Sequence, residues 1–266
     1  MLSSLRRHWP EYAIEAWGLG LFMVSAGGFA TLLFYPNSPV YALIPSGGRG
    51  VLMGVAMGLT AIAIIYSPWG KRSGAHINPA VTLAFFRLGK LAPWDAFFYV
   101  VAQFIGGLVG VWLVAIALQT AFTDRPIDYI VTVPGPWGWP AALLAEFIMA
   151  FGLMLMVLVV SNHKRWSQLT GLFAGLMVAT YITFAAPISG MSINPARSFA
   201  SALPAQVWTA FWIYYFAPPL AMLAAVEVYL RWTRANPRHL CGKLCPNVET
   251  PCLCTSCCCE ADTPMA

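Results

Sequence analysis

The sequence predicts an all-α membrane protein with six transmembrane helices, two re-entrant half-helices and an inverted internal repeat. Hydrophobic residues make up 59% of the 266 residues and charged residues only 9%, against about 25% charged residues in an ordinary soluble domain. Six apolar stretches are each long enough to cross a bilayer. The phrase Asn-Pro-Ala also occurs twice, at Asn78-Pro79-Ala80 and at Asn194-Pro195-Ala196.

Each Asn-Pro-Ala phrase is expected to begin a helix. The phrases sit in matching frames, Ser-Gly-Ala-His-Ile-Asn-Pro-Ala-Val at 73–81 and Ser-Gly-Met-Ser-Ile-Asn-Pro-Ala-Arg at 189–197. Asn is a favoured N-cap, and Pro is preorganised for the first helical position. The apolar segments that follow, 79–87 and 195–203, are too short to span, because about ten residues cover about 15 Å of a core about 30 Å thick.

The first half of the chain contains three predicted spans, at about 12–34, 50–67 and 94–118. A polar link at 69–72 joins the second span to the first repeated frame. The basic start and apolar run of the first span also fit a signal peptide. Glu15 inside the run, and the length of the run, favour a span that is retained.

The second half repeats this order, with spans at about 139–160, 168–187 and 207–231. Each half has a Glu early in its first span, Glu15 and Glu146, and the Asn of each phrase follows 63 and 48 residues later. Because each half holds an odd number of spans, the second half enters the membrane upside down. Inverted repeats with half-helices place their sites near the midplane, so the two half-helices are expected to meet there.

The placement of Lys and Arg predicts that both termini are cytoplasmic. In this orientation the inner segments hold twelve of the fifteen Lys and Arg residues, and only Arg49, Arg125 and Arg197 lie elsewhere, in agreement with the positive-inside rule. The net charge of +5 therefore reflects basic loops beside apolar spans, and no nucleic-acid partner is expected.

The meeting point of the half-helices is predicted to favour a neutral, hydrogen-bonding solute. Each half-helix directs about half an elementary positive charge at it, which repels cations. Each Asn is expected to cap its own helix through its side-chain oxygen and to leave its amide N–H groups facing the cavity. The sequence has no phosphate-binding glycine loop and no nucleophile elbow, so an enzyme is not expected.

The paired frames resemble those of the aquaporin, or major intrinsic protein, family, and the resemblance covers about residues 10–232. It implies a six-helix bundle with two half-helices, assembled as a homotetramer with one pore in each subunit. It also implies passage of water through the membrane. Ser198, where glycerol channels usually carry Asp, indicates an aquaporin rather than a glycerol facilitator, as do Ala202 and the pair Tyr214-Tyr215.

The resemblance further implies a selectivity filter built from Arg197 and three other positions. A charge at this depth usually faces a cavity. The other positions fall on Ile182, on Met191, and on either Met57 or Gly58, depending on where the link before the first frame has its extra residue. These residues depart from the family's water-selective pattern of an aromatic, a His and a Cys. A wider range of neutral solutes, such as glycerol, ammonia, hydrogen peroxide or metalloid acids, is therefore the alternative function.

Four further polar residues are expected to support the pore. His76 either lines the inner vestibule or only hydrogen-bonds to loop backbone. Glu15 and Glu146 are expected to hold the half-helix loops by accepting backbone N–H bonds, and Gln103 is expected to have a similar structural role.

The last 26 residues contain all seven cysteines: Cys241, Cys245, Cys252, Cys254, Cys257, Cys258 and Cys259. Disulfides are not expected in a reducing cytoplasm. Closely spaced thiols near His239 could hold a soft metal such as Zn or Cu(I), although no standard zinc spacing is present. An unstructured tail, or thiols for lipidation, are the alternatives. No other cofactor is expected.

The expected layout is a cytoplasmic N-terminus at 1–10, a channel domain at 11–232 and a Cys-rich cytoplasmic tail at 233–266. The domain comprises repeat one at about 11–118 and repeat two at about 139–232, in the plasma or inner membrane. A passive channel is favoured over a secondary transporter, because the few deep charges form no Asp/Glu/His relay for coupling. A metal-binding membrane protein would depend on the tail alone.

Overall fold

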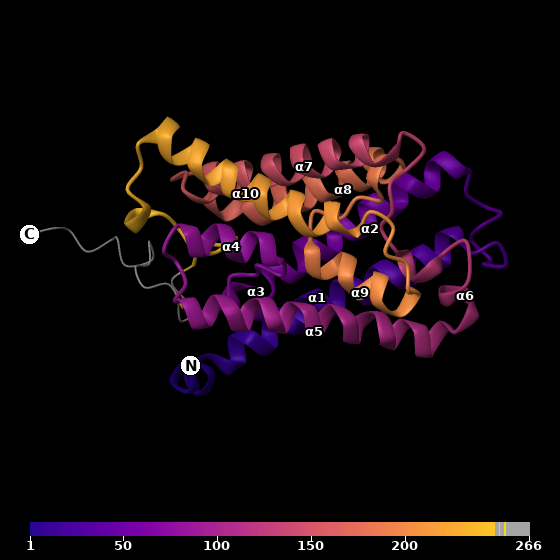
Figure 1. Cartoon of the computed structure of the whole chain (residues 1–266), viewed down its shortest axis with the longest axis horizontal. Helices are drawn as coiled ribbons and strands as arrows, with labels where there is room; N and C mark the ends of the chain where they lie inside the picture. The colour runs from indigo at the N-terminus through magenta and orange to yellow at the C-terminus, as the bar shows by residue number, and fades with distance from the viewer. Residues whose placement is uncertain (248–249, 251–252, 254–266) are drawn as a thin grey trace, which may run out of the picture.

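The computed structural model describes residues 1–247, 250 and 253, and the regular elements in these residues are all helical. Six helices are long and apolar enough to cross a membrane. They are α1 (Leu2–Phe34), α2 (Ser46–Tyr66), α5 (Pro93–Leu118), α7 (Gly138–Ser161), α8 (Thr170–Ser189) and α10 (Phe211–Thr233). Two shorter helices, α4 (Pro79–Arg87) and α9 (Pro195–Ala205), are the half-helices. The predicted fold class is confirmed (Figure 1).

The remaining elements are short and connect the spans. They are α3 (Pro68–Ser73), α6 (Thr120–Thr123) and the 3₁₀ turns η1 (Asp128–Ile130), η2 (Ser167–Leu169) and η3 (Pro237–His239). Tryptophan side chains are exposed near both ends of the bundle, as expected of residues that anchor a protein at the two membrane interfaces. They include Trp69, Trp94, Trp166 and Trp232 at one end and Trp137, Trp139, Trp208 and Trp212 at the other.

The helix contacts follow the internal repeat. In the first half α1 packs along α5, and in the second half α7 packs along α10, while α2 and α8 join the halves. The half-helix α4 lies against α10 and α5, and α9 lies against α5 and α10. Each half-helix is therefore held by spans from both halves of the chain. The start of α1 and the end of α10 lie at the same end of the bundle (Figure 1).

Two local features were not predicted. The first helix begins at Leu2 rather than near residue 12, and it continues through Pro10. Hydropathy marks where a helix becomes apolar, whereas the basic residues before that point are themselves good helix formers. The predicted link at 69–72 is the helix α3, where Ser67 Oγ accepts the Gly70 N–H at 2.9 Å as an N-cap.

Glycine allows α1 and α5 to approach closely. A Cβ atom at Gly20 would lie 3.0 Å from the carbonyl oxygen of Gly106, and one at Gly110 would lie 2.4 Å from the carbonyl oxygen of Gly20. Small residues spaced four apart permit such backbone contact between membrane helices. Gly28, on the same helix as Gly20, has open space around its Cα, with no atom within 4 Å of a built Cβ.

This difference predicts opposite effects for two alanine substitutions in α1. Gly20→Ala is expected to destabilise the bundle by about 1–3 kcal/mol, because the crowded atom is rigid backbone. Gly28→Ala is expected to be neutral or stabilising by up to about 1 kcal/mol, since Ala is the better helix former. Thermal unfolding of both variants in detergent measures these changes in stability. A Gly20→Ala protein as stable as the Gly28→Ala control would contradict the close α1–α5 contact.

Candidate functional site

The two Asn-Pro-Ala phrases begin the two half-helices. Asn78 Oδ1 accepts the Ala80 N–H at 2.9 Å, and Asn194 Oδ1 accepts the N–H groups of Ala196 and Arg197 at 3.1 and 3.2 Å. Each Asn has an extended backbone, as an N-cap requires, and the following Pro occupies the first helical position. The local sequence therefore determines where each half-helix starts.

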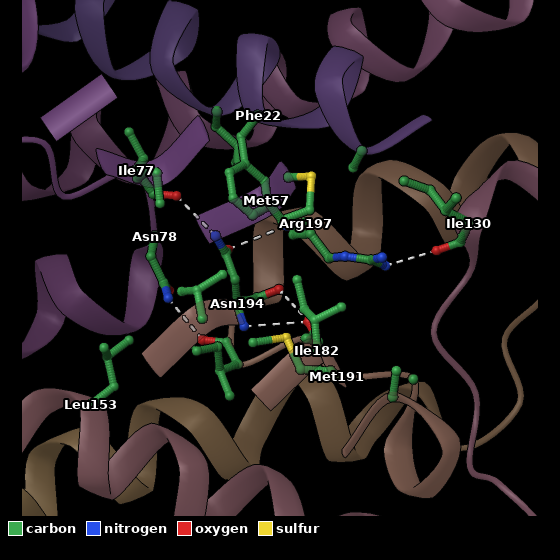
Figure 2. Close-up of a pocket in the computed structure, with 18 of the residues that line it drawn as sticks. Phe22, Met57, Ile77, Asn78, Ile130, Leu153, Ile182, Met191, Asn194 and Arg197 are labelled. Carbon is green, nitrogen blue, oxygen red and sulfur yellow. Dashed lines mark hydrogen bonds between the residues drawn. The ribbon is translucent and has the colours of Figure 1, made fainter. Parts of the chain in front are cut away.

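The two caps also bind each other's loops, which the sequence did not predict. Asn78 Nδ2 donates to the carbonyl oxygen of Ile193 at 2.7 Å, and Asn194 Nδ2 donates to that of Ile77 at 2.8 Å (Figure 2). One N–H of each amide is therefore used within the protein, and the prediction that both face the cavity is corrected. The reason is that a buried carbonyl group needs a donor. Ile77 and Ile193 take φ values of +41° and +48°.

Glu146 hydrogen-bonds to the loop that precedes the second half-helix, α9. Its carboxylate accepts hydrogen bonds from Ser189 Oγ at 2.7 Å, from the Ser192 N–H at 2.9 Å and from the Ile193 N–H at 2.6 Å. The side chain is fully buried and does not line the cavity that Asn78 and Asn194 share. Such a carboxylate can satisfy several loop donors at once, because each of its oxygens accepts two bonds.

Glu15 holds the first loop in the same way. It accepts hydrogen bonds from Ser73 Oγ at 2.7 Å, from the His76 N–H at 3.0 Å and from the Ile77 N–H at 2.5 Å. Gln103 Nε2 adds a fourth bond at 2.8 Å. The two Glu residues therefore do equivalent structural work in the two repeats.

A cavity of about 410 Å³ runs past both Asn side chains. Its wall is largely apolar, and its polar side chains are His76, Asn78, Ser192, Asn194 and Arg197. One face of α1 contributes Leu19, Phe22, Ala26 and Ala30, and one face of α2 contributes Met53, Met57, Ala61 and Ile65. The cavity is therefore a path with an apolar wall and a few polar groups at its centre.

Several wall residues were missed in the sequence, although a signal existed. Leu19, Phe22, Ala26 and Ala30 follow Glu15 at the spacing of one helix face. Because Glu15 was expected to point inward, these four side chains could have been expected to point inward as well.

The four proposed filter residues come together in the wall. Met57, Ile182, Met191 and Arg197 all line the cavity, close to the half-helix caps (Figure 2). Gly58 does not line it. A Cβ atom at Gly58 would lie 2.6 Å from the carbonyl oxygen of Gly175 in α8, so this position serves helix packing. Of the two residues considered for the second span, Met57 is the one in the wall.

The loop before α7 fixes the side chain of Arg197, and this contact was not predicted. Arg197 Nη1 donates to the carbonyl oxygen of Ile130 at 2.8 Å (Figure 2). Asp128, Tyr129 and Ile130 take φ values of +45°, +54° and +52°, a backbone that non-glycine residues seldom adopt and that often marks a functional site. Pro126, Ile127, Ile130 and Val131 of this loop line the cavity.

His76 lines the cavity, and its ring also hydrogen-bonds to backbone outside its own loop. It is only 2% exposed. Its ring stacks on Phe85, with 4.7 Å between the centroids. Nδ1 lies 3.3 Å from Thr82 Oγ1, and Nε2 lies 3.2 Å from the carbonyl oxygen of Gly242. The backbone that it binds through the ring belongs to the C-terminal segment, not to its own loop.

The predicted soft-metal site stays a prediction. Cys241 and Cys245 are buried, whereas Cys252, Cys254, Cys257, Cys258 and Cys259 lie outside the described residues. Within the described residues, no group of three or more His, Cys, Asp or Glu side chains is arranged to hold a metal.

Comparison with known proteins agrees with this geometry. The model of the major intrinsic protein family matches residues 6–229. Aquaporin NIP2-2 of Zea mays is 38% identical over 178 residues, which cover 66% of this chain and 58% of the relative. Probable aquaporin AqpM of Archaeoglobus fulgidus is 38% identical over 203 residues, which cover 73% of this chain and 82% of the relative. The chain thus spans less than two thirds of the maize relative.

A solved structure shares the fold. The X-ray structure of the aquaglyceroporin from Plasmodium falciparum superposes with a TM-score of 0.66 at 21% identity, covering 84% of this chain and 95% of that chain. The family match over the whole helical bundle shows that this chain is an integral, multi-pass membrane protein of the major intrinsic protein family, the family of the aquaporins.

Proposed function

We propose that this protein is a passive channel for water and other small neutral solutes. The observation that carries the proposal is the cavity that passes the capping Asn78 and Asn194 between two opposed helix N-termini. A solute at this point meets one remaining N–H of each Asn amide and the positive ends of two helices. An oxygen acceptor is stabilised there, and a cation is repelled.

Proton exclusion follows from the same arrangement. A water molecule whose oxygen accepts from both Asn side chains directs its own hydrogens outward, so a chain of waters cannot pass a proton through this point. Arg197 adds a fixed positive charge on the outer side, held by Ile130.

A passive mechanism is favoured over a coupled transporter or an enzyme. The deep carboxylates Glu15 and Glu146 are engaged by loop donors. A carboxylate that fixes backbone in this way is not available to bind and release a coupling ion in each cycle. Movement of either carboxylate would break the hydrogen bonds that hold its half-helix loop.

Two related functions differ in the range of solutes that would pass. Met57, Ile182 and Met191 present apolar groups in the wall that Arg197 also lines, which supports passage of solutes larger than water. The alternative to a water channel is therefore a broader facilitator for glycerol, ammonia, hydrogen peroxide or metalloid acids.

Assembly and orientation complete the proposal. A homotetramer with one pore in each subunit is proposed from the family resemblance. The start of α1 and the end of α10 lie at one end of the bundle (Figure 1). Together with the placement of Lys and Arg, this supports cytoplasmic termini.

Purified protein in liposomes tests the function directly. Osmotic shrinkage is expected to be faster than in empty liposomes, without dissipation of a proton gradient. Gradients of glycerol, urea, ammonia and hydrogen peroxide in the same preparation then define the solute range. Shrinkage at the rate of empty liposomes, both by the full chain and by a chain that ends at residue 239, would refute the channel. A proton leak would refute the exclusion mechanism.

A further inference from the structure

The C-terminal segment 240–247, named here the inner strap, turns back from α10 to the bundle (Figure 1). A chain end is usually poorly ordered unless it is tied down. In the strap, Leu240, Cys241, Lys243, Leu244 and Cys245 are each at most 7% exposed. The strap is therefore packed as part of the protein interior.

Hydrogen bonds tie the inner strap to the first repeat at the base of the Asn-Pro-Ala loop. The Leu244 N–H donates to the carbonyl oxygen of Gly74 at 3.1 Å. Asn247 Nδ2 donates to the carbonyl oxygen of Lys71 at 3.0 Å. The Asn247–Lys71 bond joins residues 176 positions apart in the chain.

The strap is also tied to the second repeat. The Cys241 N–H donates to Asn162 Oδ1 at 2.8 Å, at the inner end of α7. Gln168 Nε2 donates to the carbonyl oxygen of Pro246 at 2.7 Å, just before α8. With bonds to both halves, the strap crosses the inner mouth of the bundle from one repeat to the other.

A chain of side chains connects the strap to the carboxylate behind the first loop. Gln103 Nε2 donates to Glu15 at 2.8 Å and to Thr82 Oγ1 at 3.0 Å. Nε2 of His76 lies 3.2 Å from the carbonyl oxygen of Gly242, which can only accept, so Nε2 is the donor of this bond. In a neutral ring Nδ1 then accepts from the Thr82 hydroxyl, 3.3 Å away.

Leu244 reaches the cavity itself. Its side chain is part of the cavity wall and is only 7% exposed. The neighbouring wall residues of the inner half are also buried, whereas Pro126 in the outer half of the wall is exposed and Gly50 and Val131 are partly exposed. The buried inner residues are Ile65, Ala75, His76, Val157 and Ala174. The inner end of the cavity is thus lined by buried side chains, with Leu244 of the strap among them.

The repeat symmetry clarifies what the strap does. Gly74 and Gly190 are equivalent in the two frames and take φ values of +91° and +77°. A Cβ atom at Gly190 would lie 3.1 Å from Thr132 of the loop between the repeats, and one at Gly74 would lie 3.3 Å from Lys243 of the strap. The strap therefore occupies on the inner side the place that this loop occupies on the outer side.

We propose that the inner mouth is a docking surface for the chain's own inner strap, and that the docked strap closes the channel. The proposal rests on the proposed function, because the cavity must be the conducting path. Docking places Leu244 at the inner end of that path, where its isobutyl group offers a permeating solute no hydrogen bond. Release of the strap opens the path without movement of the membrane spans.

Osmotic shrinkage of liposomes with three proteins tests the closure. They are the full chain, a chain ending at residue 239, and a control chain ending at residue 250 that keeps the strap but lacks the last cysteines. The chain ending at 239 is expected to conduct water about tenfold faster or more per molecule, as when a minor open state of up to about 10% becomes the whole population. The control is expected to match the full chain.

The outcomes separate the two proposals. Equal and fast shrinkage by all three proteins would overturn the strap and leave the channel standing. Shrinkage by none of them, with each correctly inserted, would overturn the channel and the strap with it. Where the chain ending at 239 fails to insert, Leu244→Ala in the full chain decides. It is expected to conduct faster than the full chain, and an unchanged rate would overturn the closure.

Thiol labelling measures docking independently of flux. The control chain ending at 250 retains only Cys241 and Cys245, both buried in the docked strap. Under reducing conditions their reaction with a maleimide is expected to be much slower in the folded protein than after denaturation, and faster in the same chain carrying Leu244→Ala. Labelling as fast in the folded as in the denatured protein would overturn docking.

Discussion

Replacing Ile182 by His is expected to narrow the solute range of the channel sharply. The side chain lies in the cavity wall with Met57, Met191 and Arg197, where an imidazole adds a rigid polar ring to a wall that is otherwise apolar on this side. For the largest solute that the wild type passes, the permeability relative to water is expected to fall about tenfold, the effect of a barrier difference of about 1.4 kcal/mol.

The measurement is a set of liposome assays with water, ammonia, hydrogen peroxide, urea and glycerol. Ile182→Leu is the matched control, because it keeps the size and apolar character of the wall and is expected to keep the wild-type range. Using the chain that ends at residue 239 as the background separates the filter from the strap. An unchanged range in the His variant would show that Ile182 does not limit passage.

Replacing Glu146 by Leu is expected to unfold the second half-helix loop. Three buried donors, Ser189 Oγ and the N–H groups of Ser192 and Ile193, lose their acceptor, and each orphaned donor costs about 1–3 kcal/mol. The melting temperature in detergent is expected to fall on the order of 10 °C, since each kcal/mol corresponds to about 2–4 °C for a chain of this size. Osmotic water flow is expected to be lost as well.

Two further variants serve as controls for this prediction. Glu146→Gln keeps an amide oxygen for one of the loop N–H groups and is expected to lose less stability than Glu146→Leu. Glu227→Leu removes a carboxylate from the partly exposed ion pair with Arg87, 2.6 Å long, and such a pair contributes at most about 1 kcal/mol. If Glu146→Leu melted no lower than Glu227→Leu, the loop would not depend on this carboxylate.

The sequence predicted the membrane elements well because their signals are local. Apolar length defines a span, and an Asn-Pro step defines a helix start, so the first half-helix was predicted at 79–87 and found at Pro79–Arg87. Local signals also explain the error at the N-terminus. Hydropathy does not distinguish a polar helix end from a polar loop. The extension of α1 to Leu2 was therefore not predicted.

The contacts that complete the site were not predictable in this way. The bonds from Asn78 to Ile193 and from Arg197 to Ile130 join residues 115 and 67 positions apart. The left-handed backbone at Asp128, Tyr129 and Ile130 contradicts the intrinsic preference of each of these residues. Only the surrounding structure stabilises such a conformation.

By itself the sequence determined the fold class, the inverted repeat and the pairing of two helix caps, because hydropathy, charge placement and capping depend on neighbouring residues. Only the tertiary structure decided which amide hydrogens of Asn78 and Asn194 remain for a solute. It also decided that Met57 rather than Gly58 lines the cavity and that Leu244 of the C-terminal segment lines it too. These features depend on where distant segments meet, and the need of buried polar groups for partners fixes that meeting only in the folded chain.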